Sequence, residues 1–428
     1  MVRPRLHSTM ALVLLAGGLA GCAGGSGPPT LNWYINPDSG GQVKLAASCT
    51  QASGGRYKLK TSTLPTDASQ QREQLVRRLA AHDSSIDLMS LDPPFVAEAA
   101  NAGFLRPFTA AVAPRFTQGV LVPAVQDAMW DGKLYAAPFW ANTQLLWYRK
   151  SVVQKAGINP AAPDFTWDQM IDAALKTGTT VGEQGNKYEG YTVWINALIV
   201  SAGGSIITNN QKGADATVDI DSQAGQEAAT IISKLARSKA ASPTLSTDDE
   251  EKARALFNGK TGGFMLNWPY IWAADTGDAA SGVIPKNIPG DIGWARYPQV
   301  VAGRPSKPPL GGIELAIGAY GKHQDDAVQA AACITSPANM TKYMLDSGNP
   351  SARGASYSDP AVIKQFPMAA LIRDSINSAA PRPITPYYSD ISASIQSTWH
   401  PPVSVNPSRT PHSTQDFIPA VLHDHRLL

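Results

Sequence analysis

Apolar residues occur along this chain in two kinds of run, which alternate from residue 31 onward. Short runs rich in β-branched and aromatic side chains predict strands. Longer stretches, in which residues such as Leu75 and Leu79 recur at helical spacing, predict helices. Strands are expected at residues 31–35, 57–64, 86–91, 134–139, 144–148, 262–266 and 312–317. Helices are expected through Cys49, at 66–81, 92–103, 191–201, 224–238 and 249–257, after a capping box at 166–169, and in the C-terminal region.

Strands that alternate with crossover helices predict an α/β fold with a largely parallel sheet. A chain of 428 residues is long enough for roughly two to three domains. No linker divides the chain after residue 29, so two lobes would have to exchange segments. The expected division assigns residues 30–139 and 292–335 to the first lobe, and residues 140–291 and 336–428 to the second.

The first 29 residues have the pattern of an export signal followed by a tether. Residues 1–21 combine Arg3 and Arg5 with an apolar run that is too short for a permanent membrane span. The run ends in Leu-Ala-Gly-Cys, which is typical of a bacterial lipoprotein, so we expect cleavage before Cys22 and lipidation of its thiol. An ordinary secretory signal is the alternative. Residues 22–29 would then tether an extracytoplasmic protein to the outer face of the cytoplasmic membrane.

Composition and charge limit the classes of ligand that this protein can be expected to bind. Hydrophobic residues make up 43% of the chain and charged residues 16%, which suits a folded protein with a sizeable core. Removal of the expected leader takes away two of the 36 basic residues and leaves them balanced against 34 acidic ones. A chain without basic excess has little with which to neutralise phosphates, so nucleic acid is not an expected partner. A neutral or small ligand fits better.

Cysteine usage predicts one disulfide. If Cys22 carries lipid, Cys49 and Cys333 remain as an even pair in an oxidising compartment. Two buried free thiols are the alternative.

The sequence contains no complete motif for catalysis or for binding a cofactor or metal. Residues 258–261 resemble the end of a phosphate-binding loop, but Arg254 stands where the first glycine is needed. The cysteines and histidines lack zinc spacing, and Asp219 with Asp221 lacks the later ligands of a calcium loop. We therefore expect no cofactor and no metal. An exported glycosidase, which would need a paired set of carboxylates, remains a weaker alternative.

Several segments, taken together, resemble the family 1 extracellular solute-binding proteins, the sugar receptors of ABC importers. They follow the order of that family across nearly the whole chain after the leader. Arg149 departs from it, since the family usually has Asn before Lys. The matching segments are residues 131–138, 145–150, 156–157, 166–168, 257–260, 310–316, 348–353 and 359–360.

A closer resemblance within the family is to its trehalose-binding lipoproteins. It implies a class II periplasmic-binding-protein fold, with two α/β lobes joined by hinge strands and a ligand cleft between them. It also implies a trehalose ligand, a Cys49–Cys333 disulfide, and work as a monomer with permease subunits and their ATPase. A maltodextrin or glycerophosphodiester ligand is the runner-up. The segments that carry this resemblance are residues 141–148, 200–205, 266–269, 357–360 and 381–386.

A disaccharide presents hydroxyl groups at its rim and apolar C–H faces, so a receptor needs polar side chains and flat aromatic rings. Asp92 ends an apolar strand, where it could bind ligand or cap the next helix. Asn142 is an amide in apolar surroundings, and such a group needs a partner. A core position is the commoner fate of tryptophan, but the resemblance makes Trp268 the best candidate for ring stacking and Trp194 a weaker one.

Three further candidates lie at a helix start, in a loop and before a strand. Glu250 begins a helix, where acids are normally solvated partners of the helix dipole, and only the resemblance makes it a ligand residue. Arg382 lies between two prolines in a stiff loop, and an inter-lobe salt bridge is its alternative role. Gly311 and Gly312 would let the backbone approach a ligand closely, or would form a tight turn.

Overall fold

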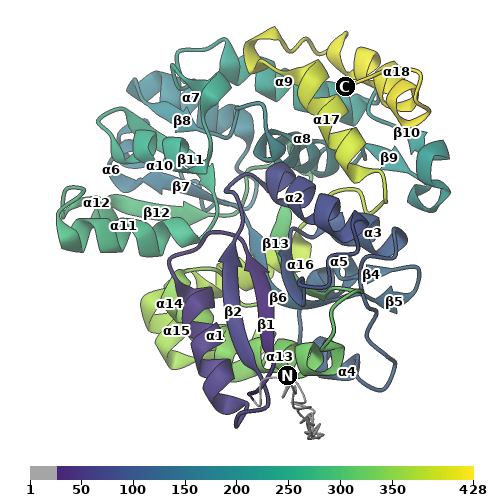
Figure 1. Ribbon diagram of the computed structural model, residues 1–428. Helices are drawn as coiled ribbons and strands as arrows, with labels where there is room; N and C mark the ends of the chain where they lie inside the picture. The colour runs from purple at the N-terminus through teal and green to yellow at the C-terminus, as the bar shows by residue number, and fades with distance from the viewer. Residues whose placement is uncertain (1–26) are drawn as a thin grey trace, which may run out of the picture.

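Two mixed β-sheets organise the computed structural model, which describes residues 27–428 (Figure 1). The first sheet has the strand order β2-β1-β3-β13-β6. In it, β1 runs parallel to β2 and β3, whereas β13 runs antiparallel to β3 and β6. Its strands are β1 (Thr30–Ile35), β2 (Lys58–Thr63), β3 (Leu88–Leu91), β6 (Ala136–Thr143) and β13 (Leu310–Ile317).

The second sheet has the order β12-β7-β11-β8. β7 runs antiparallel to both β11 and β12, and β11 runs parallel to β8. Its strands are β7 (Leu145–Arg149), β8 (Thr180–Gly182), β11 (Gly262–Asn267) and β12 (Ile292–Ala295). Two small ladders join β4 (Met129–Trp130) to β5 (Lys133–Leu134), and β9 (Ile207–Thr208) to β10 (Thr217–Val218).

The predicted α/β class is confirmed, but the predicted parallel character is only partly right. β7 and β13 are the strands that break it. Each follows a strand of the other lobe, β6 and β12 respectively, without a crossover helix between them. Parallel neighbours in a sheet need a crossover connection, which is usually a helix. β7 and β13 enter their sheets without one, so they can run antiparallel to their neighbours.

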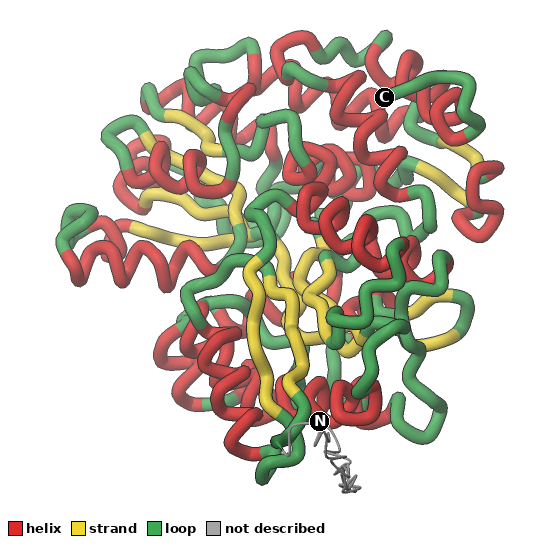
Figure 2. The backbone as a smooth tube through the Cα atoms, viewed as in Figure 1, coloured by secondary structure: helices red, strands yellow, loops and turns green. Residues whose placement is uncertain are grey.

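Helices surround both sheets (Figure 2). Those packed with the first sheet are α1 (Gly41–Ala52), α2 (Ala68–Ala80), α3 (Pro94–Asn101), α4 (Pro114–Thr117), α5 (Val122–Asp127), α13 (Gln324–Ile334), α14 (Pro337–Ser347), α15 (Pro360–Gln365) and α16 (Ala369–Ser378). The remaining helices pack on the second sheet or on one another beside it. They are α6 (Lys150–Ala156), α7 (Trp167–Thr177), α8 (Glu189–Ser201), α9 (Gln223–Ala236), α10 (Glu250–Asn258), α11 (Tyr270–Ser281), α12 (Ile288–Asp291), α17 (Tyr388–Trp399) and α18 (Thr410–Leu422).

Helix starts follow the sequence signals with small shifts. The predicted capping box is present at α7, where the Thr166 side chain accepts from the Gln169 backbone N–H. At α2 the cap is Asp67 rather than the predicted Thr66, and its carboxylate accepts from Gln70 N at 2.9 Å. A carboxylate at this position also stabilises the positive end of the helix dipole.

The expected lobe borders differ from the structure at two places. β12 pairs with β7 and so lies in the second sheet, although residues 292–335 were assigned to the first lobe. α14 packs on α1 and α16 packs on β6, so residues 337–378 lie with the first sheet rather than the second. A four-residue strand and an amphipathic helix each suit either lobe, because local pattern does not specify which apolar surface they meet.

A disulfide joins Cys49 on α1 to Cys333 on α13, with the Cα atoms 5.9 Å apart. It fixes two helices that also pack on each other. The predicted signal peptide (residues 1–21) and the lipidation at Cys22 lie outside the described residues. From residue 27 onward, none of the helices is both long and apolar enough to span a bilayer.

Candidate ligand-binding site

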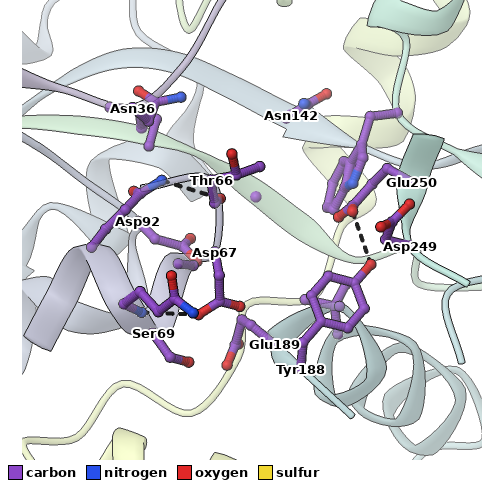
Figure 3. Close-up of a pocket in the computed structure, with 18 of the residues that line it drawn as sticks. Asn36, Thr66, Asp67, Ser69, Asp92, Asn142, Tyr188, Glu189, Asp249 and Glu250 are labelled. Carbon is purple, nitrogen blue, oxygen red and sulfur yellow. Dashed lines mark hydrogen bonds between the residues drawn. The ribbon is translucent and has the colours of Figure 1, made fainter. Parts of the chain in front are cut away.

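A cavity of about 730 Å³ lies between the two lobes, and ligand sites in proteins commonly have volumes of about 300–1,000 Å³. The first lobe contributes the start of α2 and the segment after β3, and the second contributes the starts of α8 and α10 and the residue after β11. Figure 3 shows Asn36, Thr66 and Asp92 on one side, and Tyr188, Asp249 and Glu250 on the other. Carboxyl ends of parallel strands are where open α/β sheets bind ligands.

Connections between the lobes run side by side near this cavity. Asn142, at the end of β6, is in register with Gly311 at the start of β13. The next segment joins α16 to α17, and its Ala380 carbonyl accepts from Leu310 N at 2.9 Å. Arg382 follows two residues later. Segments separated by about 170 and 70 residues in the sequence therefore bring their polar side chains to one cavity.

Six of the seven predicted ligand residues line the cavity: Asp92, Asn142, Glu250, Trp268, Gly312 and Arg382. Asn142 is 8% exposed, and its Oδ1 accepts from Thr143 N at 3.0 Å. Its Nδ2 donates to none of the described residues. A buried amide with a free donor suits a ligand hydroxyl.

Trp268 packs against the start of β13, where two glycines leave room for close neighbours. The indole of Trp268 is partly exposed in the cavity, and a Cβ on Gly311 would come within 2.9 Å of its Cη2. Gly312 has φ +131°, and a Cβ there would lie 2.2 Å from the Trp140 carbonyl oxygen on β6. Gly312 is therefore needed within a strand for close contact with β6, not for the tight turn that was one of its two predicted roles.

The seventh candidate, Trp194, is a core residue. Its side chain has no exposed surface and packs in the second core beside Trp167, with 6.0 Å between ring centroids. The prediction of a cavity contact is wrong because nearly every residue of α8 is buried, so the helix has no apolar face that distinguishes core from cleft.

Arg382 connects the lobes by ion pairs. Its Nη1 donates to Asp92 Oδ2 at 2.9 Å and to Glu189 Oε1 at 2.7 Å, and its Nη2 also contacts Asp92 Oδ1. Asp92 follows β3 in the first lobe, and Glu189 begins α8 in the second. The alternative role of Arg382 as an inter-lobe salt bridge is thus realised, while its side chain also lines the cavity. Asp92 does not cap α3, which begins at Pro94 with Pro93 at its N-cap and without a side-chain cap.

Glu250 is partly buried rather than freely solvated. Its Oε2 accepts from Tyr188 Oη at 2.9 Å, and its backbone carbonyl accepts from Asn267 Nδ2 at 2.9 Å. Burial raises the pKa of Glu250, and the hydrogen bonds that it accepts oppose this rise. Glu250 belongs to no ion pair among the described residues, so its carboxylate is available to a ligand hydroxyl.

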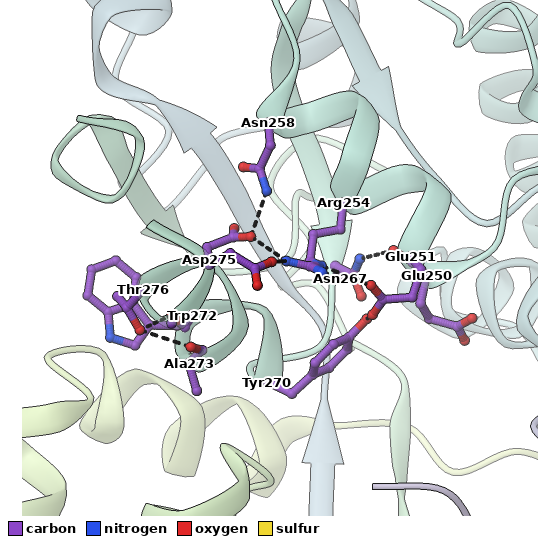
Figure 4. A network of polar contacts seen from close by, with 12 residues as sticks. Glu250, Glu251, Arg254, Asn258, Asn267, Tyr270, Trp272, Ala273, Asp275 and Thr276 are labelled. Atoms are coloured by element: carbon purple, nitrogen blue, oxygen red, sulfur yellow. Dashed lines mark hydrogen bonds and ion pairs between the residues drawn. The ribbon is translucent and has the colours of Figure 1, made fainter. Parts of the chain in front are cut away.

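A polar network behind Glu250 fixes α10 to α11 (Figure 4). Arg254 Nη1 contacts Asp275 Oδ1 and Asp278 Oδ2, both at 2.8 Å, and its Nη2 contacts Glu251 Oε2 at 3.0 Å. Tyr270 Oη donates to Glu251 Oε1 at 2.5 Å. These contacts hold the start of α10, with Glu250, against α11, the helix that directly follows Trp268.

Sequence reasoning missed several lining residues. Glu189 and Tyr188 begin an apolar helix, where polar residues have a sufficient explanation as its start. Trp140 was passed over beside Asn142, although its ring stacks on Tyr343 with 5.2 Å between centroids. Asn36 and Gln396 stand in segments without any distinguishing pattern. From residue 27 onward, three or more His, Cys, Asp or Glu side chains do not meet as a metal site.

Residues 52–341 match the model of the bacterial extracellular solute-binding protein family, which covers more than half of the chain. The chain belongs to this family. A probable ABC transporter-binding protein of Deinococcus radiodurans is 29% identical over 281 residues, which are 61% of each chain. A probable amino-acid ABC transporter periplasmic-binding protein of Sinorhizobium fredii is 28% identical over 247 residues, 55% of this chain and 52% of that protein. The chain thus spans between about half and two thirds of these relatives.

Solved structures agree in fold. Maltose-bound MalE3 of T. maritima has a TM-score of 0.81 at 24% identity, covering 93% of this chain and 100% of that one. UgpB of Mycobacterium tuberculosis, in complex with glycerophosphocholine, has a TM-score of 0.75 at 17% identity, with 94% and 100% covered. The predicted two-lobed periplasmic-binding-protein fold is confirmed. The family is one of binding proteins and not of enzymes, which argues against the glycosidase alternative.

Proposed function

We propose that this protein is the receptor of an ABC sugar importer and binds trehalose in the cavity between its lobes. The observation that carries the proposal is the meeting of Trp268, Asn142, Glu250 and Arg382 around one cavity. A partly exposed indole suits a sugar C–H face, and a buried amide, a partly buried carboxylate and a buried guanidinium group suit its hydroxyls.

The affinity that such a site can reach is adequate for a receptor. A hydrogen bond to a charged group contributes about 1.5–3 kcal/mol. A few of these, with one stacked ring, are enough for micromolar binding at about −8 kcal/mol. Because ligand contacts come from both lobes, a bound sugar would favour the closed arrangement that a permease recognises.

Charge favours a neutral sugar over a phosphodiester. Among the described residues, the lining includes two cationic side chains and six acidic ones. One cation, Arg382, is already paired with two carboxylates, and the other, Lys187, is exposed. An anionic ligand would meet repulsion from most of this lining. A glycerophosphodiester is therefore the weaker candidate, and a maltodextrin is the nearer alternative.

The choice of trehalose within the neutral sugars is supported by the resemblance to the trehalose-binding lipoprotein of the mycobacterial trehalose-recycling importer. The segments 141–148, 266–269 and 381–386 carry that resemblance, and each contributes a cavity residue. The proposal includes work as a monomer with permease and ATPase subunits, and a lipid anchor at Cys22 on the extracytoplasmic side of the membrane.

Titration calorimetry with trehalose, maltose and glycerophosphocholine tests the proposal. We expect saturable trehalose binding, at least tenfold weaker maltose binding and little glycerophosphocholine binding. Trp268→Ala, Asp92→Ala and Arg382→Ala should each weaken trehalose binding at least tenfold. Equal affinity for maltose and trehalose would refute trehalose specificity but spare the sugar receptor, whereas binding of none of the three would contradict the receptor itself.

A further inference from the structure

Glu189 accepts hydrogen bonds from two other side chains besides Arg382. Its Oε1 accepts from Arg382 Nη1 at 2.7 Å and also from Tyr388 Oη. Its Oε2 accepts from Ser392 Oγ at 2.7 Å. Glu189, Tyr388 and Ser392 are all buried. Four groups from three separate segments thus form one cluster, and two of them, Arg382 and Glu189, line the cavity.

The two hydroxyls come from one face of α17. Tyr388 and Ser392 are four residues apart, a spacing that puts two side chains on the same side of a helix. α17 packs on α8, whose first residue is Glu189, and it also contacts α3 in the first lobe. The same face carries Gln396, which lines the cavity and donates from Nε2 to Ser392 Oγ at 3.0 Å.

The hydroxyls of Tyr388 and Ser392 help to keep Glu189 ionised in this cluster. Arg382 is paired with two carboxylates, Asp92 and Glu189, so the buried group has one negative charge more than positive. Burial raises the pKa of Glu189, and Asp92 adds to the rise, whereas Arg382 and the hydrogen bonds from Tyr388 and Ser392 oppose it. Asp127 is the next acid near Arg382 and Asp92, and Glu314 lies near Asp127.

Protonation of Glu189 would release Arg382 from the second lobe. The guanidinium would then keep a charged partner only in Asp92, on the first lobe, and its position in the cavity would be fixed less firmly from the second. A bidentate or bridging arginine owes its geometric specificity to having both partners in place.

We propose that Tyr388 and Ser392 are positioning residues for the sugar site, because they hold the Glu189 carboxylate in place and through it hold Arg382 between the lobes. This inference rests on the proposed function, since it assigns a role to residues that touch no ligand. It extends the site to α17, a helix near the far end of the chain.

Two pairs of variants test the proposal. Tyr388→Phe removes one hydroxyl, and its control is Tyr191→Phe, because Tyr191 is equally buried but donates to the Trp399 carbonyl at 2.9 Å. Ser392→Ala removes the other, and its control is Ser394→Ala, because Ser394 is buried two residues further along α17 and donates to the Asp390 carbonyl at 2.7 Å. The Ser392 pair serves if Tyr388→Phe does not fold.

Trehalose affinity measured from pH 5 to pH 8 is the first readout. We expect Tyr388→Phe and Ser392→Ala to bind about tenfold more weakly near neutral pH, the size expected when a charged group loses a hydrogen bond. Their affinity should also begin to fall at a higher pH than in the wild type when the pH is lowered. Wild-type affinity in both variants, or a loss without any shift of the pH profile, would overturn the proposal. An equal loss in the Tyr191 and Ser394 controls would also do so.

The second readout needs no ligand and so separates this proposal from the receptor function. Because the folded-state pKa of Glu189 is raised, the carboxyl group makes the folded state less stable as the pH rises towards that pKa. In Tyr388→Phe this decline should extend to a higher pH, and Tyr191→Phe should follow the wild type. If trehalose does not bind to the wild type while this shift is seen, the receptor proposal fails and the positioning role stands. If the shift is absent, the positioning role fails.

Discussion

The two ends of the cavity are built in different ways. At one end, Asn142, Gly311 and Trp268 lie on strands or directly after them, and neighbouring strand register sets their positions. At the other end, Arg382 lies in a connecting loop, and it is held by carboxylates that come from two lobes. The strand-built end depends on close backbone packing, and the charged end depends on long-range ion pairs. Substitutions at the two ends should therefore affect stability and affinity in different proportions.

The largest expected effect is at the charged end. Arg382→Ala leaves the buried Glu189 and the partly buried Asp92 without their cation, and breaking a buried ion pair in this way costs about 3–5 kcal/mol. We expect urea denaturation to show a loss of this size at pH 7. Arg373→Ala is the control, because that arginine forms a largely solvated pair with its neighbour Asp374, and such pairs contribute about 0–1 kcal/mol. Equal effects of the two variants would contradict the difference between buried and exposed pairs.

The two predicted tryptophans should separate stability from affinity. Trp194→Ala removes a fully buried side chain and should cost about 3–5 kcal/mol of unfolding free energy. Trp268→Ala removes a partly exposed ring, so its cost should be smaller, while trehalose affinity should fall at least tenfold. Denaturation and calorimetry on both variants check this. If Trp268→Ala lost stability but kept its affinity, the ring would be a packing residue and not a stacking surface.

These contrasts also show which features the sequence predicted. Local pattern favoured Asn142, because a polar residue in an apolar strand stands out from its neighbours, whereas Trp268 was singled out by the resemblance. It misplaced Trp194, because α8 is buried on all sides and offers no contrast between its faces. The pairing of Arg382 with Glu189 joins residues 193 positions apart, so no spacing could predict it.

The same limit applies to the division into lobes. The strands and helices that were predicted lie within a few residues of their observed positions, because they depend on local periodicity and caps, whereas short elements such as β8 and β12 were missed. The assignments of β12 and α14 were wrong, because each depends on which distant apolar surface it covers. Local structure is therefore well determined by this sequence, and the partners of each element are less so.

A pH-dependent effect should separate the charged end from the strand-built end. Burial raises the pKa of Asp127 to about 7, with Arg382 opposing and Asp92 adding to the rise. An unfolded Asp has a pKa near 3.9, so the folded protein binds more protons between these values and becomes less stable as the pH rises through that window. The loss between pH 5 and pH 8 should be about 2–3 kcal/mol.

Asp127→Asn lacks this proton, so its stability should improve relative to the wild type by that amount as the pH is raised from 5 to 8. Denaturant midpoints at several pH values measure the difference. The exposed Asp164 provides the control substitution to Asn, which should leave the pH profile unchanged. Parallel profiles for Asp127→Asn and the wild type would mean that the buried carboxyl does not titrate in this range.

The smallest expected effect belongs to the strand-built end. In Gly311→Ala, the new Cβ would lie 2.9 Å from Trp268 Cη2, so the indole must shift by a few tenths of an ångström. A shifted ring stacks less well, and trehalose affinity should fall a few-fold, with about 1 kcal/mol or less of stability lost. Gly277→Ala is the matched control, because its Cβ would meet nothing within 4 Å on α11 and alanine there favours the helix. Calorimetry that finds the same affinity in both variants would mean that Trp268 can move without loss, so that its exact position over Gly311 does not determine sugar binding.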